Sequence, residues 1–376
     1  MSRKEEKMEK YNNFVVYGYY GYGNAGDEAL LTVIVNHLRT YNPNSEVTVI
    51  SNDPINTMEN NPVKAVKLKK KINKVMQFFS LMRKNDVIIL GGGGIIQDSN
   101  NNIGTLVYML ILVTIAKLLN KKVIFYGISA GPINYKLSQK IVKLIINKAD
   151  ITVVRDIKSK ELLKELGAQT NIKVTADLVF ALPLLAQNMT KNNYVAISAM
   201  PYYKIVKNDA LKDQEIVEAF LNLTNYIIEK YDYDIKFVSM QDSVDGALGV
   251  EVQKQSLFKE RIEIIDSVSA FEKYKVISES ELTIGMRLHS LIFAAKSRVP
   301  FIGISYHPKV ESFIESMDMD KNSVDINEIT SPTLISLIDE VLSNDKKPME
   351  NYSNKVGKIE GISNQSLDIL ISSLNN

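Results

Sequence analysis

The chain of 376 residues contains no cysteine and only three histidines, His37, His289 and His307. The absence of cysteine excludes disulfide frameworks, thiolate nucleophiles and cysteine-ligated zinc. Three histidines leave little room for a histidine-rich metal site, and no ligand cluster in the sequence requires a metal. The formal net charge is only +2, so the chain as a whole lacks the positive charge of a nucleic-acid-binding protein, and we expect no nucleic-acid partner.

Long apolar runs are also missing. The most apolar segment, residues 104–119, is shorter than the about 20 residues of a typical spanning helix. It also contains Thr105, Thr114 and Lys117, so we interpret it as a buried helix on a parallel sheet. Residues 1–13 are charged and polar, without the apolar core of a secretory signal. These features predict a cytoplasmic protein, and a location at the inner face of the membrane is compatible with them.

Apolar strand-like segments alternate with helical segments through both halves of the chain. This alternation predicts an α/β protein with two doubly wound, Rossmann-like domains, each built on a parallel sheet. Residues 183–193 are polar and without periodicity, which is typical of a linker. We therefore expect an N-terminal domain at 1–186, a C-terminal domain at 187–350 and a final helical segment at 351–376.

Ligands of open parallel sheets bind at the carboxyl ends of the strands. Glycine-rich or polar segments follow predicted strands at residues 18–28, 91–94, 129–132, 155–156, 285–289 and 305–307. If the two domains face one another, these segments line one cleft.

The first glycine-rich loop has the G-x-G-x-x-G spacing at Gly21, Gly23 and Gly26, between a strand and a helix expected from Ala29. The loop is longer than a Rossmann turn and carries three tyrosines, which speaks against a dinucleotide-binding module. A polar substrate suits it better, and Asp27 could also be the helix N-cap. The polar residues of this loop that could contact a substrate are Asn24, Asp27 and Glu28.

Residues 69–84 form a predicted helix in which basic residues surround apolar and aromatic ones. Such a segment can make peripheral contact with an anionic membrane surface. A surface helix whose apolar side packs on the sheet explains the same pattern, and the sequence alone favours this second interpretation.

The segment from Leu282 to His307 holds the strongest candidate site. A short strand ends at Gly285, and an apolar helix then begins with Arg287 and His289 in its first turn. The free N–H groups and the positive dipole end of a helix N-terminus favour anions. The added arginine and histidine therefore predict a site for phosphate or carboxylate, with an ordinary solvated helix face as the alternative.

Six motifs, in this order, resemble those of the polysaccharide pyruvyl transferases of the CsaB type. They are Gly23–Glu28, Gly91–Gly94, Gly131-Pro132, Val154–Asp156, Gly285–His289 and Gly303–Tyr306. The resemblance covers roughly residues 14–345. It implies a two-domain fold similar to GT-B glycosyltransferases, in which the last helix commonly returns to the first domain. It also implies phosphoenolpyruvate as the donor, no separate cofactor, and a cell-wall or surface sugar, often lipid-linked, that receives pyruvate as a ketal.

The resemblance suggests roles for the charged residues. Arg287 and Arg155 would be anion ligands, since a guanidinium binds phosphate and carboxylate bidentately. His289 would protonate the methylene carbon of the donor or contact its phosphate, and the sequence does not separate these roles. In the family an aspartate is expected where His307 stands, which leaves the role of His307 open. Further candidates for substrate contact are Asn24, Gly26, Gly93, Gly94, Ser129, Gly131, Ser305, Tyr306 and His307.

A carboxylate is the expected base for the sugar hydroxyls. Asp27 and Glu28 are the nearest candidates by their position in the loop. Asp156 is an alternative, although an aspartate beside Arg155 more often only orients the arginine. A glycosyltransferase that uses a nucleotide sugar is the rival interpretation, because the same fold would place a diphosphate at the same basic helix start.

Overall fold

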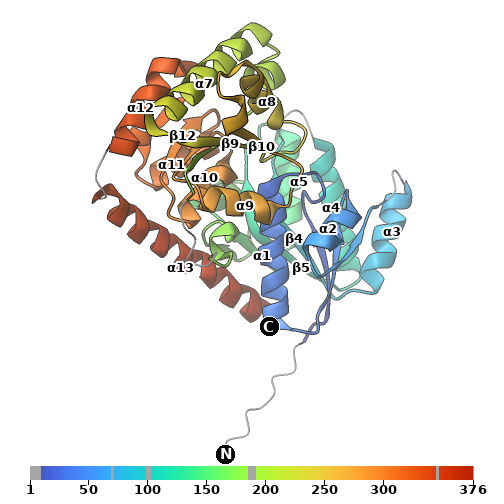
Figure 1. Cartoon of the computed structure of the whole chain (residues 1–376). Coiled ribbons are helices and arrows are strands. Elements are labelled where there is room, and N and C mark those ends of the chain that lie inside the picture. Colours follow the sequence, from blue (N-terminus) through green and yellow to red (C-terminus); the bar gives the residue numbers. More distant parts are fainter. Residues whose placement is uncertain (1–9, 69–71, 99–102, 185–191, 344–346, 376) are drawn as a thin grey trace, which may run out of the picture. The chain divides into compact units, whose positions relative to one another are not determined.

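The structure, a computed structural model, describes residues 10–68, 72–98, 103–184, 192–343 and 347–375. The chain divides into two compact units. Unit 1 comprises residues 1–22, 27–182 and 360–376, and unit 2 comprises residues 23–26 and 183–359. Each unit is a parallel sheet with helices (Figure 1), which confirms the predicted α/β fold class. Most of the expected linker, residues 185–191, lies outside the described residues.

Unit 1 is built on a seven-stranded sheet of order β3-β2-β1-β4-β5-β6-β7, and its neighbouring strands are parallel. The strands are β1 (Asn13–Tyr17), β2 (Glu46–Ile50), β3 (Lys64–Val66), β4 (Val87–Ile96), β5 (Lys122–Ala130), β6 (Ile151–Val154) and β7 (Ile172–Val174). The helices are α1 (Ala25–Tyr41), α2 (Pro54–Asn60), α3 (Ile72–Arg83), α4 (Ile103–Leu118), α5 (Lys136–Ile146), α6 (Ile157–Glu165) and the 3-10 turn η2 (Leu178–Ala181). The central strands are near-continuous apolar runs, as expected for a sheet covered on both faces.

Successive side chains of β5 point to opposite faces of the sheet and identify two helix layers. Phe125 belongs to the core that α3, α4 and α5 form with the sheet. The hydroxyl of the next residue, Tyr126, instead lies 2.7 Å from Nδ1 of His37 on α1. Helices α3 to α5 therefore cover one face of the sheet, and α1 covers the other.

His37 makes the stability of unit 1 depend on pH. Burial lowers the pKa of its imidazole from 6.5 to about 4, so between these values the unfolded chain binds a proton that the folded chain excludes. The stabilisation is fully present above pH 6.5 and is lost as the pH falls toward 4. We expect the free energy of unfolding to drop by about 3 kcal/mol across this range. Urea unfolding at several pH values should show this slope, and His37→Leu should flatten it; an unchanged slope in the variant would contradict the assignment.

The glycine quartet Gly91–Gly94 lies inside β4, not in a loop after the strand as predicted. Gly92 and Gly93 have φ angles of +72° and +77°, and the register with β5 shifts between Gly93 and Ile96. A positive φ is costly for residues with a Cβ, so this bulge requires glycine. The prediction was wrong because glycine carries no hydropathy signal that would extend a strand.

Unit 2 is built on a six-stranded parallel sheet of order β10-β9-β8-β11-β12-β13. The strands are β8 (Tyr194–Ser198), β9 (Asp234–Val238), β10 (Ile262–Ile265), β11 (Leu282–Gly285), β12 (Phe301–Ser305) and β13 (Ser323–Asp325). The main helices are α7 (Ala210–Tyr231), α8 (Gly246–Gln255), α9 (Ala270–Ser278), α10 (Leu288–Lys296), α11 (Pro308–Ser316), α12 (Ser331–Ser343) and α13 (Lys347–Asn375), with a π-helical turn at η3 (Tyr203–Lys207). Neither α11 nor β13 was predicted from the sequence.

Helix α13 belongs to both units, with residues up to Ile359 in unit 2 and those from Glu360 in unit 1. In unit 2 the buried hydroxyl of Tyr352 donates to the carbonyl of Val299 at 3.0 Å. In unit 1 the buried hydroxyl of Ser363 donates to the carbonyl of Asp177 at 2.9 Å. Both halves of the helix are therefore anchored by buried polar contacts as well as by packing. None of the described helices combines the length and the apolar character that a membrane-spanning helix needs.

Candidate functional site

Arg287 occupies the N-cap position of α10, at the carboxyl end of β11. Its guanidinium forms a fork on the carboxylate of Asp245, with Nη2 2.6 Å from Oδ1 and Nε 3.1 Å from Oδ2. The Asp245 side chain is fully buried, whereas 24% of the Arg287 side chain is exposed. The arginine is thus held by a fixed partner while its guanidinium stays partly accessible.

The charge of Arg287 is secured by its surroundings. Burial opposes the charge, but hydrogen bonding and attraction to Asp245 and contact with Tyr306 outweigh it, so the pKa of Arg287 is raised above its ordinary value. The carboxylate of Asp245 also accepts a hydrogen bond from the backbone N–H of Gln241 at 2.9 Å. Arg287 is therefore a permanent, oriented cation at a helix start.

Sequence reasoning missed Asp245, which stands between β9 and α8. A buried carboxylate that holds an arginine 42 residues away leaves no local pattern. Its one signal is an aspartate directly before the glycine that opens a helix.

The motif Gly23–Gly26 is paired with the segment that follows β9. Asn24 and Gln241 form an isolated antiparallel bridge, and the N–H of Ala25 donates to the carbonyl of Met240 at 2.8 Å. The amide of Asn24 also donates to Oε1 of Gln241 at 3.2 Å. These contacts explain why this short stretch belongs to unit 2, while the rest of α1 belongs to unit 1.

Helix α1 begins at Ala25, four residues earlier than predicted. Oδ1 of Asn24 accepts a hydrogen bond from the N–H of Gly26 at 3.0 Å, so Asn24 satisfies a free N–H group of the first turn. Asp27 lies inside this first turn, and its interpretation as the N-cap is wrong. Asn24, a predicted substrate contact, uses both ends of its amide within the protein.

His289 lies in the first turn of α10, half-buried, with its ring directly against Gly26. A Cβ placed on Gly26 would be 1.9 Å from Nδ1 of His289 and 2.3 Å from Cγ. Such distances are far below van der Waals contact, so a side chain at position 26 would require the His289 ring to move. The two residues were predicted separately as site residues, and the structure brings them together.

Replacement of Gly26 by alanine is expected to displace the His289 ring while leaving its chemistry intact. We predict a loss of about 100-fold in turnover, comparable to the loss of a positioned acid–base group, in a protein that still folds. Gly357→Ala is the matched control, because a Cβ at position 357 meets nothing within 4 Å. Steady-state kinetics beside thermal unfolding tests this, and full activity of Gly26→Ala would show that the His289 position is unimportant.

The loop after β9 contains a second buried ion pair, between Lys273 of α9 and Asp242. The Lys273 side chain is almost fully buried, and the carboxylate of Asp242 also accepts from the N–H of Ser267 at 3.1 Å. Gly23 lies against Asp242, with a Cβ position 3.0 Å from the Asp242 Cβ. This pair, which sequence reasoning also missed, supports the segment that holds the glycine motif.

The Ser305–His307 segment ends β12 and opens α11. The Tyr306 ring lies 5.4 Å from that of Tyr202. Nδ1 of His307 accepts a hydrogen bond from the N–H of Lys309 at 3.3 Å and caps α11. Burial and the charge of Lys309 lower the pKa of His307, which favours the neutral, accepting ring. Aspartate is a preferred N-cap, so His307 does structurally what the aspartate expected at this position would do.

In unit 1, Asp27 lies against the bulge of β4. A Cβ placed on Gly93 would be 2.6 Å from Oδ1 of Asp27, so the structure brings these two predicted site residues together. Oε1 of Glu28 instead accepts a hydrogen bond from the N–H of Gly21 at 2.7 Å. Glu28 therefore closes the loop before α1. Gly94, the next residue of β4, is half-buried.

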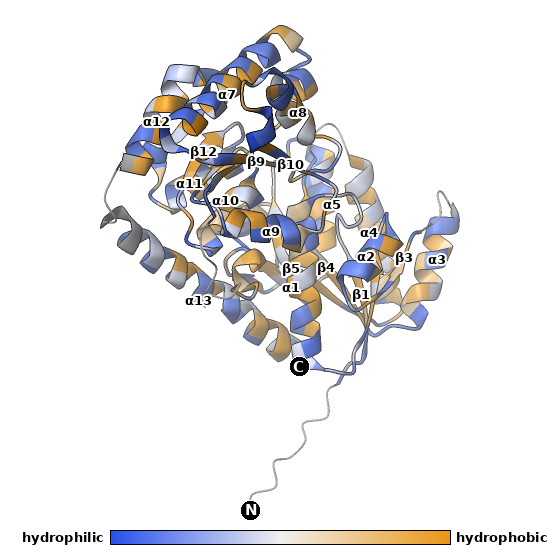
Figure 2. Cartoon of the chain, in the orientation of Figure 1, coloured by the Kyte–Doolittle hydropathy of each residue, from blue (hydrophilic) through white to orange (hydrophobic). Residues whose placement is uncertain are grey.

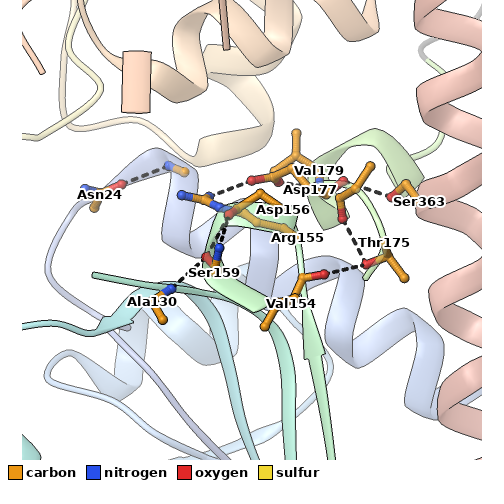
Figure 3. Close-up of polar contacts among 12 residues, drawn as sticks. Asn24, Ala130, Val154, Arg155, Asp156, Ser159, Thr175, Asp177, Val179 and Ser363 are labelled. Atoms are coloured by element: carbon orange, nitrogen blue, oxygen red, sulfur yellow. Dashed lines mark hydrogen bonds and ion pairs between the residues drawn. The ribbon is translucent and has the colours of Figure 1, made fainter. Parts of the chain in front are cut away.

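Arg155, at the end of β6, forms an ion pair with Asp177, Nη1 to Oδ2 2.6 Å (Figure 3). Both side chains are only 8% exposed. Asp156 instead caps α6, and its Oδ1 accepts from the N–H of Ser159 at 2.7 Å. The expectation that Asp156 orients Arg155 is therefore wrong, because helix capping uses the adjacent aspartate and a carboxylate from the next strand's loop holds the arginine.

Ser129 and Gly131 mark the end of β5. Ser129 lies in the strand and is half-buried. Gly131 has a φ of +101° and its N–H donates to the carbonyl of Ile96 at 2.8 Å. Between them, the N–H of Ala130 donates to Oγ of Ser159 at 2.9 Å (Figure 3). The end of β5 is thus tied to the end of β4 and to the first turn of α6.

Two exposed tyrosines of the loop after β1 were noted in the sequence only as bulk. Tyr19 and Tyr22 stack with ring centroids 4.2 Å apart and planes 9° apart, and each is nearly half exposed. Burial raises the pKa of Tyr19, and the neighbouring Tyr22 and Asp27 add to this. The pair is a flat aromatic surface beside the candidate base Asp27. Among the described residues, no group of three or more histidine, aspartate or glutamate side chains is arranged to hold a metal ion.

Comparison with known structures places the fold among UDP-N-acetylglucosamine 2-epimerases and glycosyltransferases of GT-B type. The Neisseria meningitidis 2-epimerase matches with a TM-score of 0.60 and 14% identity over 97% of this chain and 100% of that one. The Methanocaldococcus jannaschii 2-epimerase matches with a TM-score of 0.60 and 16% identity over 93% and 98%. At these identities the likeness is one of fold alone.

The family is defined by sequence. The profile described as polysaccharide pyruvyl transferase matches residues 24–308, and the chain belongs to this family. A relative from Erwinia amylovora, amylovoran biosynthesis protein AmsJ, is 24% identical over 252 residues, which are 61% of this chain and 60% of that protein. The family match, residues 24–308, begins at Asn24 and contains Arg287 and His289.

Proposed function

We propose that the protein transfers pyruvate from phosphoenolpyruvate to two hydroxyls of one sugar in a polysaccharide or its precursor, as a ketal, and releases phosphate. The observation that carries the proposal is Arg287, which stands two residues before His289. Arg287 is a permanent cation, and the buried Asp245 holds it in place. Family membership supports a transferase that acts in polysaccharide modification. The donor and the ketal product are what the resemblance to this family implies, and the residues named here offer the chemistry that such a reaction requires.

Phosphoenolpyruvate carries a phosphate and a carboxylate on a three-carbon skeleton, so its binding requires a fixed cation with several N–H donors. A guanidinium meets this need, because its planar fork can bind an oxyanion bidentately. One edge of the Arg287 guanidinium is used by Asp245, and the side chain remains partly exposed. The N-terminus of α10 adds N–H groups and a positive dipole end. We therefore assign Arg287 as the residue that binds phosphoenolpyruvate, the donor substrate.

To form the ketal, the methylene carbon of the donor must gain a proton, and two sugar hydroxyl oxygens must each form a bond to the central carbon of the donor. His289 protonates the methylene carbon of the donor, which becomes the methyl group of the product. One sugar hydroxyl attacks the resulting electrophilic carbon, phosphate leaves with its bridging oxygen, and a second hydroxyl completes the ketal. An imidazole is suited to the first step because histidine ordinarily titrates near neutral pH.

The acceptor needs a base and a surface that recognises a sugar ring. Asp27 is our candidate for the base, because it lies against Gly93 and close to Tyr19. The stacked Tyr19 and Tyr22 offer an apolar ring face, to which the C–H side of a sugar can pack. A lipid carrier on this sugar is compatible with the proposal.

The test is incubation of the protein with phosphoenolpyruvate and a panel of free, nitrophenyl-linked and lipid-linked amino sugars. We expect phosphate release that depends on the acceptor, together with a product whose mass has gained one ketal-linked pyruvyl group. Thermal unfolding with phosphoenolpyruvate or with UDP- and GDP-sugars is the companion measurement, because a ligand of the folded state raises its stability. Stabilisation by nucleotide sugars alone, with no pyruvylated product, would refute the proposal in favour of glycosyl transfer.

A further inference from the structure

The outer surface of the α3–α5 layer of unit 1 combines exposed apolar side chains with positive charge. Each of the three helices buries one stripe against the sheet, including Phe78 of α3, Leu112 of α4 and Ile145 of α5. Apolar residues also occur on the opposite side of each helix, where they are exposed. They are Met76 and Phe79 of α3, Val107, Ile111 and Leu118 of α4, and Leu137 and Leu144 of α5.

These exposed residues recur at helical spacing. Val107, Ile111 and Leu118 are four and seven residues apart, so they form one stripe along α4. Leu118 is 76% exposed and Met76 is 67% exposed, which is unusual for large apolar side chains on adjacent helices. Helix α4 contacts α3 on one side and α5 on the other, and Figure 2 shows hydrophobic and hydrophilic segments side by side on α3. The stripes therefore belong to one layer.

The charge of this layer is mostly positive, although Asp150, which directly follows it, pairs with Lys117 of α4 at 2.9 Å. Residues 72–149 contain ten lysines and arginines and only two acidic residues, Asp86 and Asp98, although the whole chain has a net charge of only +2. Both acids are engaged within the fold. Asp98 is buried and accepts from the N–H groups of Asn134 and Tyr135 at 2.8 and 2.9 Å, and Asp86 accepts from the N–H of Asn13 at 3.2 Å.

The basic side chains flank the apolar stripes. Arg83 and Lys84 end α3 and are exposed, as are Lys136 and Lys140 on α5. Lys74 of α3 lies 3.8 Å above the ring centroid of Tyr108 on α4, which links the two helices by a cation–π contact. Apolar groups that are ringed by lysine and arginine match the interface of a bilayer with anionic lipids, where apolar side chains insert and cations meet head groups.

We propose that the outer surface of α3, α4 and α5 docks on an anionic membrane surface without crossing it. The occupant is a lipid bilayer, because a nucleic acid would leave the apolar stripes unexplained and a second copy of this face would oppose like charges. The sequence interpretation of residues 69–84 as an ordinary packed helix accounts for the buried Phe78 and Met82, but not for the exposed Met76 and Phe79. Residues 69–71 lie outside the described residues and are not part of the proposed surface. The proposal does not depend on the pyruvyl transfer reaction.

Vesicle co-sedimentation of the full chain tests this, with phosphatidylcholine alone and mixed with phosphatidylglycerol. We expect binding to the mixed vesicles only. Arg83→Glu/Lys84→Glu/Lys140→Glu should weaken it by at least about 100-fold, and Phe79→Ser/Ile111→Ser/Leu118→Ser by about tenfold or more. Leu118→Ser alone is a milder variant should the triple variant not fold. Control variants from unit 2, Leu211→Ser/Leu257→Ser and Lys254→Glu/Lys259→Glu, replace exposed residues of the same two kinds and should bind like wild type.

Three outcomes would overturn the proposal. The first is that the wild-type chain does not sediment with anionic vesicles. The second is that the folded apolar variants bind as well as wild type while heparin competes fully, which would indicate general binding to polyanions. The third is a dimer in light scattering that the apolar variants abolish, with no vesicle binding, which would make the face a contact between copies.

Discussion

Arg287→Ala is expected to reduce acceptor-dependent phosphate release from phosphoenolpyruvate by about 1000-fold, the upper range for removal of one fixed anion-binding group. The variant loses the guanidinium that we assign to the binding of phosphoenolpyruvate. It also removes the cation from the fully buried Asp245 carboxylate, which keeps the hydrogen bond from the N–H of Gln241. Removal of one partner of a buried ion pair costs about 3–5 kcal/mol, so thermal unfolding should shift as well.

A double variant separates these two effects. In Arg287→Ala/Asp245→Asn the buried group is neutral, so much of the lost stability should return while activity should not. Arg287→Lys keeps the positive charge but not the planar fork, and it should bind the donor less tightly than wild type. Turnover of folded Arg287→Ala within tenfold of wild type would mean that the arginine only neutralises Asp245. Phosphate release and urea unfolding, measured on the same samples, distinguish the outcomes.

The sequence predicted the fold class because alternating apolar segments are a local signal that a parallel α/β sheet produces in every strand. It failed where the chain departs from periodicity. The four glycines inside β4 carry no hydropathy pattern, and the strand continues through them because a bulge at Gly93 keeps pairing with β5. Helix α11 was missed because it has only nine residues and follows His307, which is not among the commonest capping residues.

The site was predictable to the extent that its residues are close in sequence. Arg287 and His289 share one helix start, so a local motif indicated both. Their supports come from other elements. Asp245 follows β9. Gly26 stands at the start of α1, where it lies in contact with the His289 ring. Tertiary packing selects such partners, and one sequence contains no record of which distant residues meet.

Arg155 shows the opposite case, in which a motif indicated a residue but contained no information about the partner of that residue. The arginine was expected to bind an anion and to be oriented by Asp156. In the structure a different carboxylate, Asp177, neutralises it at 2.6 Å, and both side chains are nearly buried. Arg287 is paired with an aspartate as well, but 24% of its side chain is exposed against 8% for Arg155, so Arg287 is the more accessible candidate for donor binding.

His289→Ala is expected to lower turnover by about 100-fold or more if the imidazole protonates the donor, the usual size of acid–base catalysis. The Michaelis constant for phosphoenolpyruvate should change much less. His289→Gln retains a hydrogen-bond donor of similar reach but cannot deliver a proton at neutral pH, so it should be as slow as the alanine variant. Stopped assays over a range of donor concentrations separate the two constants.

Chemical rescue makes this prediction specific to proton transfer. Added imidazole should restore part of the turnover of His289→Ala, because the truncated side chain leaves space next to Gly26, where the ring lies in the wild type. It should leave the wild type unaffected. In D2O the rescued reaction should place deuterium in the methyl group of the ketal, which reports the protonation step directly. A variant with unchanged turnover but weakened donor affinity, and without rescue, would make His289 a phosphate ligand and would require another acid.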